Sequence, residues 1–238
     1  MKETAIYKWW QKTKEDLAQM TWRQRIDHIW TYYKVTIVIS LVFVFIVGSM
    51  VYGRLTAKDI LLGGIHANVE LTDTGHSHIV TDFFQLREGN ASREEVSILD
   101  VTLGPIKDEK YFEMNYYNLQ TVHTRIGSEQ ADYILADKVA MENFLSQSIY
   151  LDLREFFTTE ELAQMENENR LIYLMTVDED DNPTVDEKYP VAVDVSGLPF
   201  FEEYAKKKGE IYFSVVSNSH NKEAVRAFWD YLCAFEVQ

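Results

Sequence analysis

The sequence has little cysteine and little proline, and both shortages narrow the class of protein. One cysteine among 238 residues, Cys233, excludes an intramolecular disulfide framework. Only four prolines occur, and the sequence has neither repeats nor low-complexity segments. With 46% hydrophobic and 13% aromatic residues, the composition fits a globular domain with a substantial core. The length allows one such domain and an appendage.

Basic charge is also scarce. Lys and Arg number 23 against 38 Asp and Glu, which gives a formal net charge of −15. A nucleic acid is therefore excluded as a partner, because a phosphate backbone needs a basic patch. The simplest use of the acidity is to keep the protein soluble.

Familiar catalytic motifs are missing: the sequence has no nucleophile elbow, phosphate-binding loop, zinc signature or paired-acid motif. His76 and His78 have an H-x-H spacing that suits a metal, but only Asp73 or Asp82 lies at ligand spacing. A solvated turn explains the two histidines better. We therefore expect a non-enzymatic protein with no cofactor and no metal.

Charge is absent from one long run, residues 35–53, which holds nineteen uncharged residues between Lys34 and Arg54. A helix of this length spans roughly 28 Å, close to the hydrocarbon thickness of a bilayer. A buried core helix is a poorer explanation, because a soluble helix shows a polar face. A cleaved signal peptide is also poorer, because the leader is long and Ala57 offers only a weak cleavage site. The run predicts an uncleaved transmembrane helix in contact with the lipid bilayer.

Charge on the two sides of this helix predicts its orientation. Residues 1–34 hold seven Lys or Arg and four Asp or Glu. The remaining 204 residues hold 16 basic residues (23 minus 7) and 34 acidic ones (38 minus 4). Basic flanks stay in the cytoplasm. We expect a single-pass protein of the cell membrane with a cytoplasmic N-terminus and an extracytoplasmic C-terminal part.

Residues 1–34 have the pattern of a cytoplasmic amphipathic helical segment. Thr21 and Gln24 have capping-box spacing. An apolar aromatic face beside basic residues favours a helix that lies on the inner membrane surface, with two short helices packed on each other as the alternative. The residues expected at the two membrane interfaces are Trp22, Ile26, Trp30, Tyr33 and Tyr52.

After a linker at 54–58, residues 59–238 alternate short apolar runs with helical patterns, which predicts one α/β domain. Tyr133–Ala136 has no polar alternation and so indicates a parallel strand covered on both faces. We expect a three-layer sandwich with a mostly parallel sheet. The predicted strands are 60–69, 96–104, 133–136, 170–177, 189–196 and 210–216. The predicted helices are 78–90, 115–127, a helix that begins at Asp137, 158–168 and 222–235. Cys233 is expected to face the core from the last of these helices.

Three segments resemble a known family. "EIYFSVVSNSHNKEAVRAFWDYL" (210–232) is similar to the end of bacterial extracytoplasmic solute-binding proteins of the type II periplasmic-binding fold. Its helix follows the pattern K-E-A-x-x-F-x-x-(F/Y)-L, with Phe228 one position late. "ADYILADKVAMENFLSQSIYLDL" (131–153) resembles the strand–helix unit of that family, and "KYPVAVDVS" (188–196) its return to the sheet.

The chain also departs from that family. The short stretch between Ser196 and Glu210 leaves no room for a second lobe, and a helix replaces the lipobox cysteine as the anchor. The resemblance therefore implies a single lobe, and one wall is half of a ligand clamp. We expect a non-enzymatic binding or assembly module with a protein partner. The alternative is a genuine receptor for a sugar, amino acid or peptide that serves a transporter or sensor and is completed by an oligomeric partner.

Four residues near predicted strand ends are the candidates for ligand contact: Asp137, Asp194, Ser196 and Asn218. Asp137 is more simply a helix cap, and Asn218 a turn residue. The acidic loop 178–188 has calcium-loop offsets, but Pro183 stands where glycine is needed and Tyr189 where glutamate is needed. A flexible acidic hairpin tip explains this loop better than a calcium site.

Overall fold

A computed structural model describes residues 21–145, 149–177 and 183–236. The chain divides into two compact units, Met1–Ala57 and Lys58–Gln238. The first twenty residues, which belong to the predicted cytoplasmic segment, lie outside the described residues.

The first unit contains one long helix, α2 (Trp22–Thr56). Residues 22–34, which precede the apolar run, and the run itself therefore form one continuous helix. The predicted capping box is confirmed, since Gln24 Oε1 accepts a hydrogen bond of 3.0 Å from Thr21 N. An 18-residue window within Tyr33–Thr56 has a mean hydropathy of 2.6, and none of its residues is buried, so this helix is long and apolar enough to cross a membrane.

The expected membrane-interface residues project from α2. Trp22 is 74% exposed and Tyr52 is 70% exposed. Ile26 and Trp30 are also exposed, and Tyr33 is partly buried. Large aromatic side chains left uncovered on a helix suit a headgroup environment.

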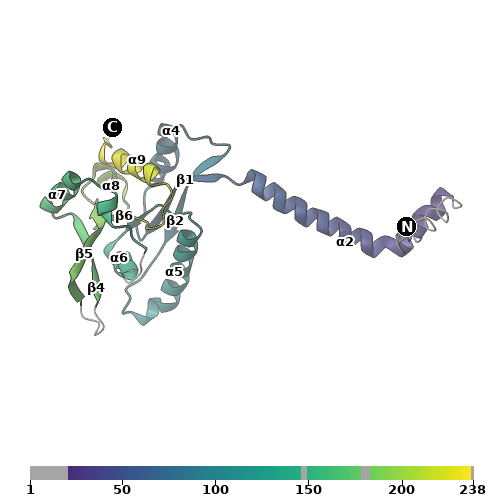
Figure 1. Ribbon diagram of the computed structural model, residues 1–238, viewed down its shortest axis with the longest axis horizontal. Coiled ribbons are helices and arrows are strands. Elements are labelled where there is room, and N and C mark those ends of the chain that lie inside the picture. Colours follow the sequence, from purple (N-terminus) through teal and green to yellow (C-terminus); the bar gives the residue numbers. More distant parts are fainter. Residues whose placement is uncertain (1–20, 146–148, 178–182, 237–238) are drawn as a thin grey trace, which may run out of the picture. The chain divides into compact units, whose positions relative to one another are not determined.

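The second unit contains a six-stranded mixed sheet in the order β2-β1-β3-β6-β5-β4 (Figure 1). The strands are β1 (Asp59–Ala67), β2 (Glu94–Val101), β3 (Tyr133–Ala136), β4 (Leu171–Val177), β5 (Pro183–Asp194) and β6 (Tyr212–Val215). The expected strands are all present. The expected parallel pairing is confirmed for β2, β1 and β3, whereas β6 pairs with β3 and β5 in antiparallel fashion, as β4 does with β5.

Helices follow most strands. They are α3 (Asp73–Ser77), the π-helix η1 (His78–Asp82), α4 (Phe83–Leu86), η2 (Glu109–Tyr111), α5 (Phe112–Gly127), α6 (Lys138–Leu145), η3 (Leu153–Glu155), α7 (Thr159–Asn167), α8 (Pro199–Tyr204) and α9 (Lys222–Cys233). Successive residues of a strand face opposite sides of the sheet. Tyr133 belongs to an apolar cluster that includes Phe228 of α9, and its neighbour Ile134 belongs to a second cluster that includes Phe144 of α6.

A buried carboxylate ties the sheet to the turn before α9. Asp132 is 4% exposed, and its Oδ2 accepts a hydrogen bond of 2.8 Å from Gly63 N. Its Oδ1 accepts a bond of 2.7 Å from Ser219 Oγ. Both oxygens of the carboxylate therefore have partners, as burial requires.

Two expectations need correction, and one lies outside the described residues. The stretch between Ser196 and Glu210 contains helix α8, which the sequence pattern did not predict. Cys233 is exposed, because the inward positions of α9 end at Leu232. The acidic tip 178–182, with its calcium-loop offsets, falls outside the structure as described.

Candidate functional site

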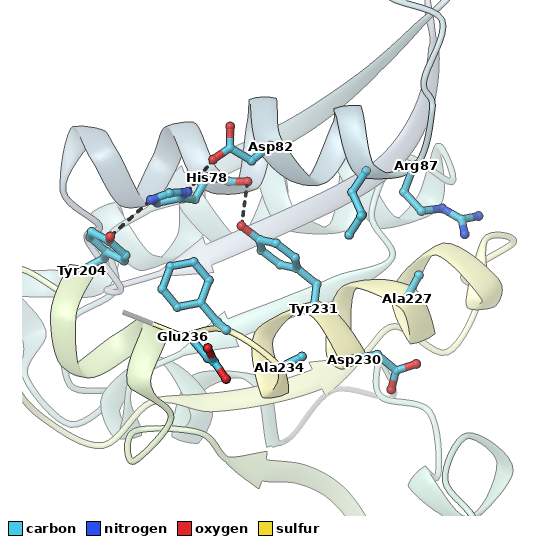
Figure 2. Close-up of a pocket in the computed structure, with 11 residues that line it drawn as sticks. His78, Asp82, Arg87, Tyr204, Ala227, Asp230, Tyr231, Ala234 and Glu236 are labelled. Carbon is cyan, nitrogen blue, oxygen red and sulfur yellow. Dashed lines mark hydrogen bonds and ion pairs between the residues drawn. The ribbon is translucent and has the colours of Figure 1, made fainter. Parts of the chain in front are cut away.

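A groove of about 990 Å³ lies between the η1–α4 segment and α9 (Figure 2). Its size is at the upper end of the range found for ligand pockets. The residues that line it are His78, Asp82, Leu86, Arg87, Tyr204, Ala227, Asp230, Tyr231, Ala234, Phe235 and Glu236.

Each wall is a row of side chains at helical spacing. His78, Asp82 and Leu86 are four residues apart along one wall. The other wall holds Ala227 and Tyr231 of α9, with Ala234 and Phe235 just beyond the end of the helix. These residues adjoin the buried stripe of α9, which consists of Ala224, Val225, Phe228, Trp229 and Leu232. Since Ala227, Tyr231 and Phe235 are partly buried against the same core cluster, α9 has one broad apolar face whose edge lines the groove.

A chain of three polar side chains crosses one end of the groove. Asp82 Oδ2 lies 2.6 Å from His78 Nδ1, and His78 Nε2 lies 3.2 Å from the hydroxyl of Tyr204 (Figure 2). The Asp82 carboxylate accepts from Nδ1–H, which orients the ring so that Nε2 faces the tyrosine hydroxyl. Both ring nitrogens are then engaged, and the chain fixes α8 against η1.

The hydroxyl of Tyr231 approaches the backbone of the π-helix. It lies 3.4 Å from the carbonyl oxygen of His78, which also accepts from the backbone N–H of Phe83 (Figure 2). Burial, with the nearby charge of Asp82, raises the pKa of Tyr231 to about 12. The phenol therefore stays protonated at physiological pH and remains a hydrogen-bond donor.

The inner end of the groove is aromatic. The Phe235 ring lies 5.3 Å from the His78 ring and 5.1 Å from the Phe200 ring, in edge-to-face geometry. Tyr204 and Tyr231 add their rings to the same cluster, at 5.7 and 6.0 Å from Phe235. Such pairs are favourable beyond the area that they bury.

Acidic groups dominate the rim. The lining holds the carboxylates of Asp82, Asp230 and Glu236 and one guanidinium, that of Arg87. Asp230 pairs with Arg226 at 3.1 Å, and Arg87 lies 3.5 Å from Glu223. These acidic groups outnumber the two guanidinium groups, so the rim is net negative.

The predicted contact residue Asp137 is used inside the protein. Its Oδ1 accepts from Ala140 N at 2.8 Å and so caps α6, as the simpler sequence interpretation held. The same oxygen accepts from Asn68 Nδ2 at 3.0 Å. Asp137 also lines a cavity of about 230 Å³ at the carboxyl ends of β1 and β3.

Asp194 and Ser196 lie at the same end of the sheet as Asp137, and Asn218 does not. Asp194 Oδ1 accepts from the backbone N–H and the hydroxyl of Ser196, which lines a cavity of about 430 Å³ that adjoins the Asp137 cavity through shared residues such as Lys207 and Ile211. Asn218 follows β6, which runs antiparallel to β3, and so lies at the opposite end of the sheet from Asp137. Its Nδ2 donates to Ile126 O at 2.9 Å.

A second crevice, of about 340 Å³, opens beside the carboxyl ends of β1 and β2. His66 lines it and is 2% exposed, and its Nε2 lies 3.1 Å from the hydroxyl of Tyr133. Burial, with a smaller effect of His76, lowers the pKa of His66 to about 3. The ring is therefore neutral, and the 3.7 Å approach of Asp100 is no ion pair at physiological pH.

Sequence reasoning missed the groove. His78 was considered only with His76 as a metal pair, and Tyr204 is 126 residues away from it. Within the described ranges, no group of three His, Cys, Asp or Glu side chains is placed to hold a metal ion. The available signal was the extra apolar residues Ala227, Tyr231 and Phe235, which make the apolar face at the end of the chain wider than its buried stripe.

Comparison of the chain with family models, curated proteins and solved structures finds no match. The likeness to solute-binding proteins stays a prediction from the quoted segments.

Proposed function

We propose that the protein is a single-pass membrane protein with its N-terminus in the cytoplasm and residues 59–238 outside. The apolar stretch of α2 and the basic flank of residues 1–34 support this orientation. The outer unit would be one lobe of the solute-binding kind, a three-layer sandwich. The presence of an apolar cluster on each face of the sheet supports this arrangement.

The outer lobe, in this proposal, is a non-enzymatic binding and assembly module that docks a partner protein in the groove between η1–α4 and α9. The observation that carries the proposal is the open groove itself, whose lining combines the exposed Leu86 with the partly buried rings of Tyr231 and Phe235. Contiguous apolar surface beside polar rims marks interaction sites. The Asp82–His78–Tyr204 chain serves here to hold the groove's shape, because its hydrogen bonds are satisfied internally.

Site-specific photo-crosslinking in intact cells of the source organism tests this function. A photoreactive amino acid replaces Leu86, which is 65% exposed in the groove, or Ile106, which is 60% exposed in the loop before η2. We expect a discrete protein adduct from position 86 and none from position 106. Equal adducts from both positions, or none from position 86, would contradict docking in the groove.

A small-molecule receptor is the alternative, and the crevice beside His66 favours it. Its volume of about 340 Å³ suits a sugar or amino acid, and it lies at the carboxyl ends of parallel strands where ligands bind in open α/β sheets. Thermal-shift measurements of the full chain against sugars, amino acids and short peptides separate the two functions. A reproducible rise with one compound class that a His66→Gln substitution abolishes would favour the receptor.

A further inference from the structure

We infer that the occupant of the groove is an amphipathic helix of a partner protein, with Lys or Arg residues beside its apolar stripe. This inference rests on the proposed docking function and names the kind of partner.

The walls of the groove have the geometry of a helix-packing surface. His78, Asp82 and Leu86 form a ridge at four-residue spacing, and Ala227 and Tyr231 of α9 begin another, with Phe235 just after the end of the helix. Ridges of this spacing accept the ridges of a third helix between them. Helices that dock in apolar grooves present anchor residues at positions i, i+3 or i+4 and i+7. Walls whose side chains lie about one helical turn apart match this spacing.

The apolar content of the groove favours a side chain from outside. Leu86 is 65% exposed although it ends a helix whose Phe83 is fully buried. Ala227 and Ala234 are small and leave space above α9, next to the rings of Tyr231 and Phe235. A large aliphatic or aromatic anchor can enter this space and cover Leu86, as central anchors do in protein interfaces.

Charge selects the flanks of such a helix. The Asp82 carboxylate keeps 51% of its side-chain surface exposed and Glu236 is exposed as well, whereas the Arg87 side chain keeps 32%. Asp230 keeps 59% exposed and is paired with Arg226. Residues 35–238 carry 16 basic and 34 acidic side chains, so the long-range field also attracts cations. A second copy of the same acidic lobe would be repelled, which leaves a basic helix as the complementary partner.

Binding of model peptides to the full chain in phosphatidylcholine nanodiscs tests the inference. Two peptides of about 18 residues, roughly five helical turns, share one Leu and Trp stripe and differ only in Lys or Glu flanks. Titration against empty nanodiscs gives the blank. We expect the Lys peptide to bind at least about tenfold more tightly than the Glu peptide, with an affinity that falls as salt rises.

Matched variants locate the peptide. Leu86→Ser should weaken binding of the Lys peptide at least about tenfold, while Ile106→Ser, at similar exposure, leaves it unchanged. Glu236→Lys should weaken binding, and Glu142→Lys, on the exposed side of α6, should not. Equal binding of both peptides overturns the charge assignment. If neither peptide binds, the helix inference is overturned. The proposed docking function then survives only if the photoreactive amino acid at position 86 still gives a protein adduct in cells.

Discussion

Asn68 and Asp137 join the carboxyl ends of two neighbouring parallel strands, β1 and β3, through a 3.0 Å hydrogen bond between Nδ2 and Oδ1. Asn68 also exchanges two 2.8 Å hydrogen bonds with the backbone of Leu103, after β2. The edge of the sheet at which an α/β protein often binds a ligand is thus occupied in part by the protein's own polar groups. This arrangement favours the groove beside α9 as the docking surface.

Replacement of Asn68 by alanine should lower the free energy of unfolding by roughly 2–4 kcal/mol. The part-buried groups of Leu103 and Asp137 would lose their hydrogen-bond partner. Alanine also tolerates the left-handed backbone conformation less well than asparagine does. The φ angle of Asn68 is 61°. Chemical denaturation measures the change. Asn169→Ala is the control, since Asn169 has a φ of 55° but is exposed, and it should cost about 1 kcal/mol. Equal costs at the two positions would contradict the role of the hydrogen bonds.

Gly63 should be intolerant of alanine. A Cβ there would lie 2.2 Å from the carbonyl oxygen of Gln130, a backbone atom that cannot move without disturbing Asp132. We expect Gly63→Ala to cost at least about 3 kcal/mol or to prevent folding. Gly197→Ala is the control, because a Cβ at Gly197 would meet no described atom within 4 Å. Thermal unfolding of both variants measures the difference in stability. A Gly63→Ala protein as stable as the Gly197→Ala protein would contradict the close packing of Gly63 against the backbone of Gln130.

Acid should destabilise the second unit, Lys58–Gln238, through His66. Burial lowers the pKa of His66 to about 3 in the folded protein, below its ordinary value of 6.5. The unfolded chain therefore binds the proton first, so this contribution to stability is complete above pH 6.5 and is lost as the pH falls from 6.5 toward 3. From pH 7.5 to 5 the loss amounts to about 2 kcal/mol. Denaturant titrations at both pH values should show this extra loss in the native sequence and not in His66→Gln; the same loss in both would refute a neutral buried His66.

Local patterns predicted most elements of the second unit. The buried run Tyr133–Ala136 is strand β3, and the predicted helix 158–168 is α7, which a capping box of Thr158 and Glu161 starts. The sequence could not reveal that β6 inserts antiparallel between β3 and β5, because strand order depends on pairings between residues far apart. Helix α8 was missed because its six residues, from Pro199, are too few for a helical period to show.

The groove could not be predicted from the sequence for the same reason, because it is formed by segments that are far apart in the chain. Contacts between His78 and Tyr204, or between Tyr231 and His78, join positions more than a hundred residues apart. Local spacing shows which residues share a helix face, but not which faces meet. Cys233 illustrates the limit within one helix, since it adjoins the buried Leu232 and is nonetheless exposed.

The orientation of the protein is tested most directly by labelling Cys233, its single cysteine, which is exposed. A membrane-impermeant maleimide is added to intact cells and to permeabilised cells. Thr4→Cys in a Cys233→Ser background reports on the N-terminal side of the helix. We predict that Cys233 is labelled in intact cells and that the Thr4→Cys variant is labelled only after permeabilisation. The reverse pattern would contradict an extracytoplasmic lobe.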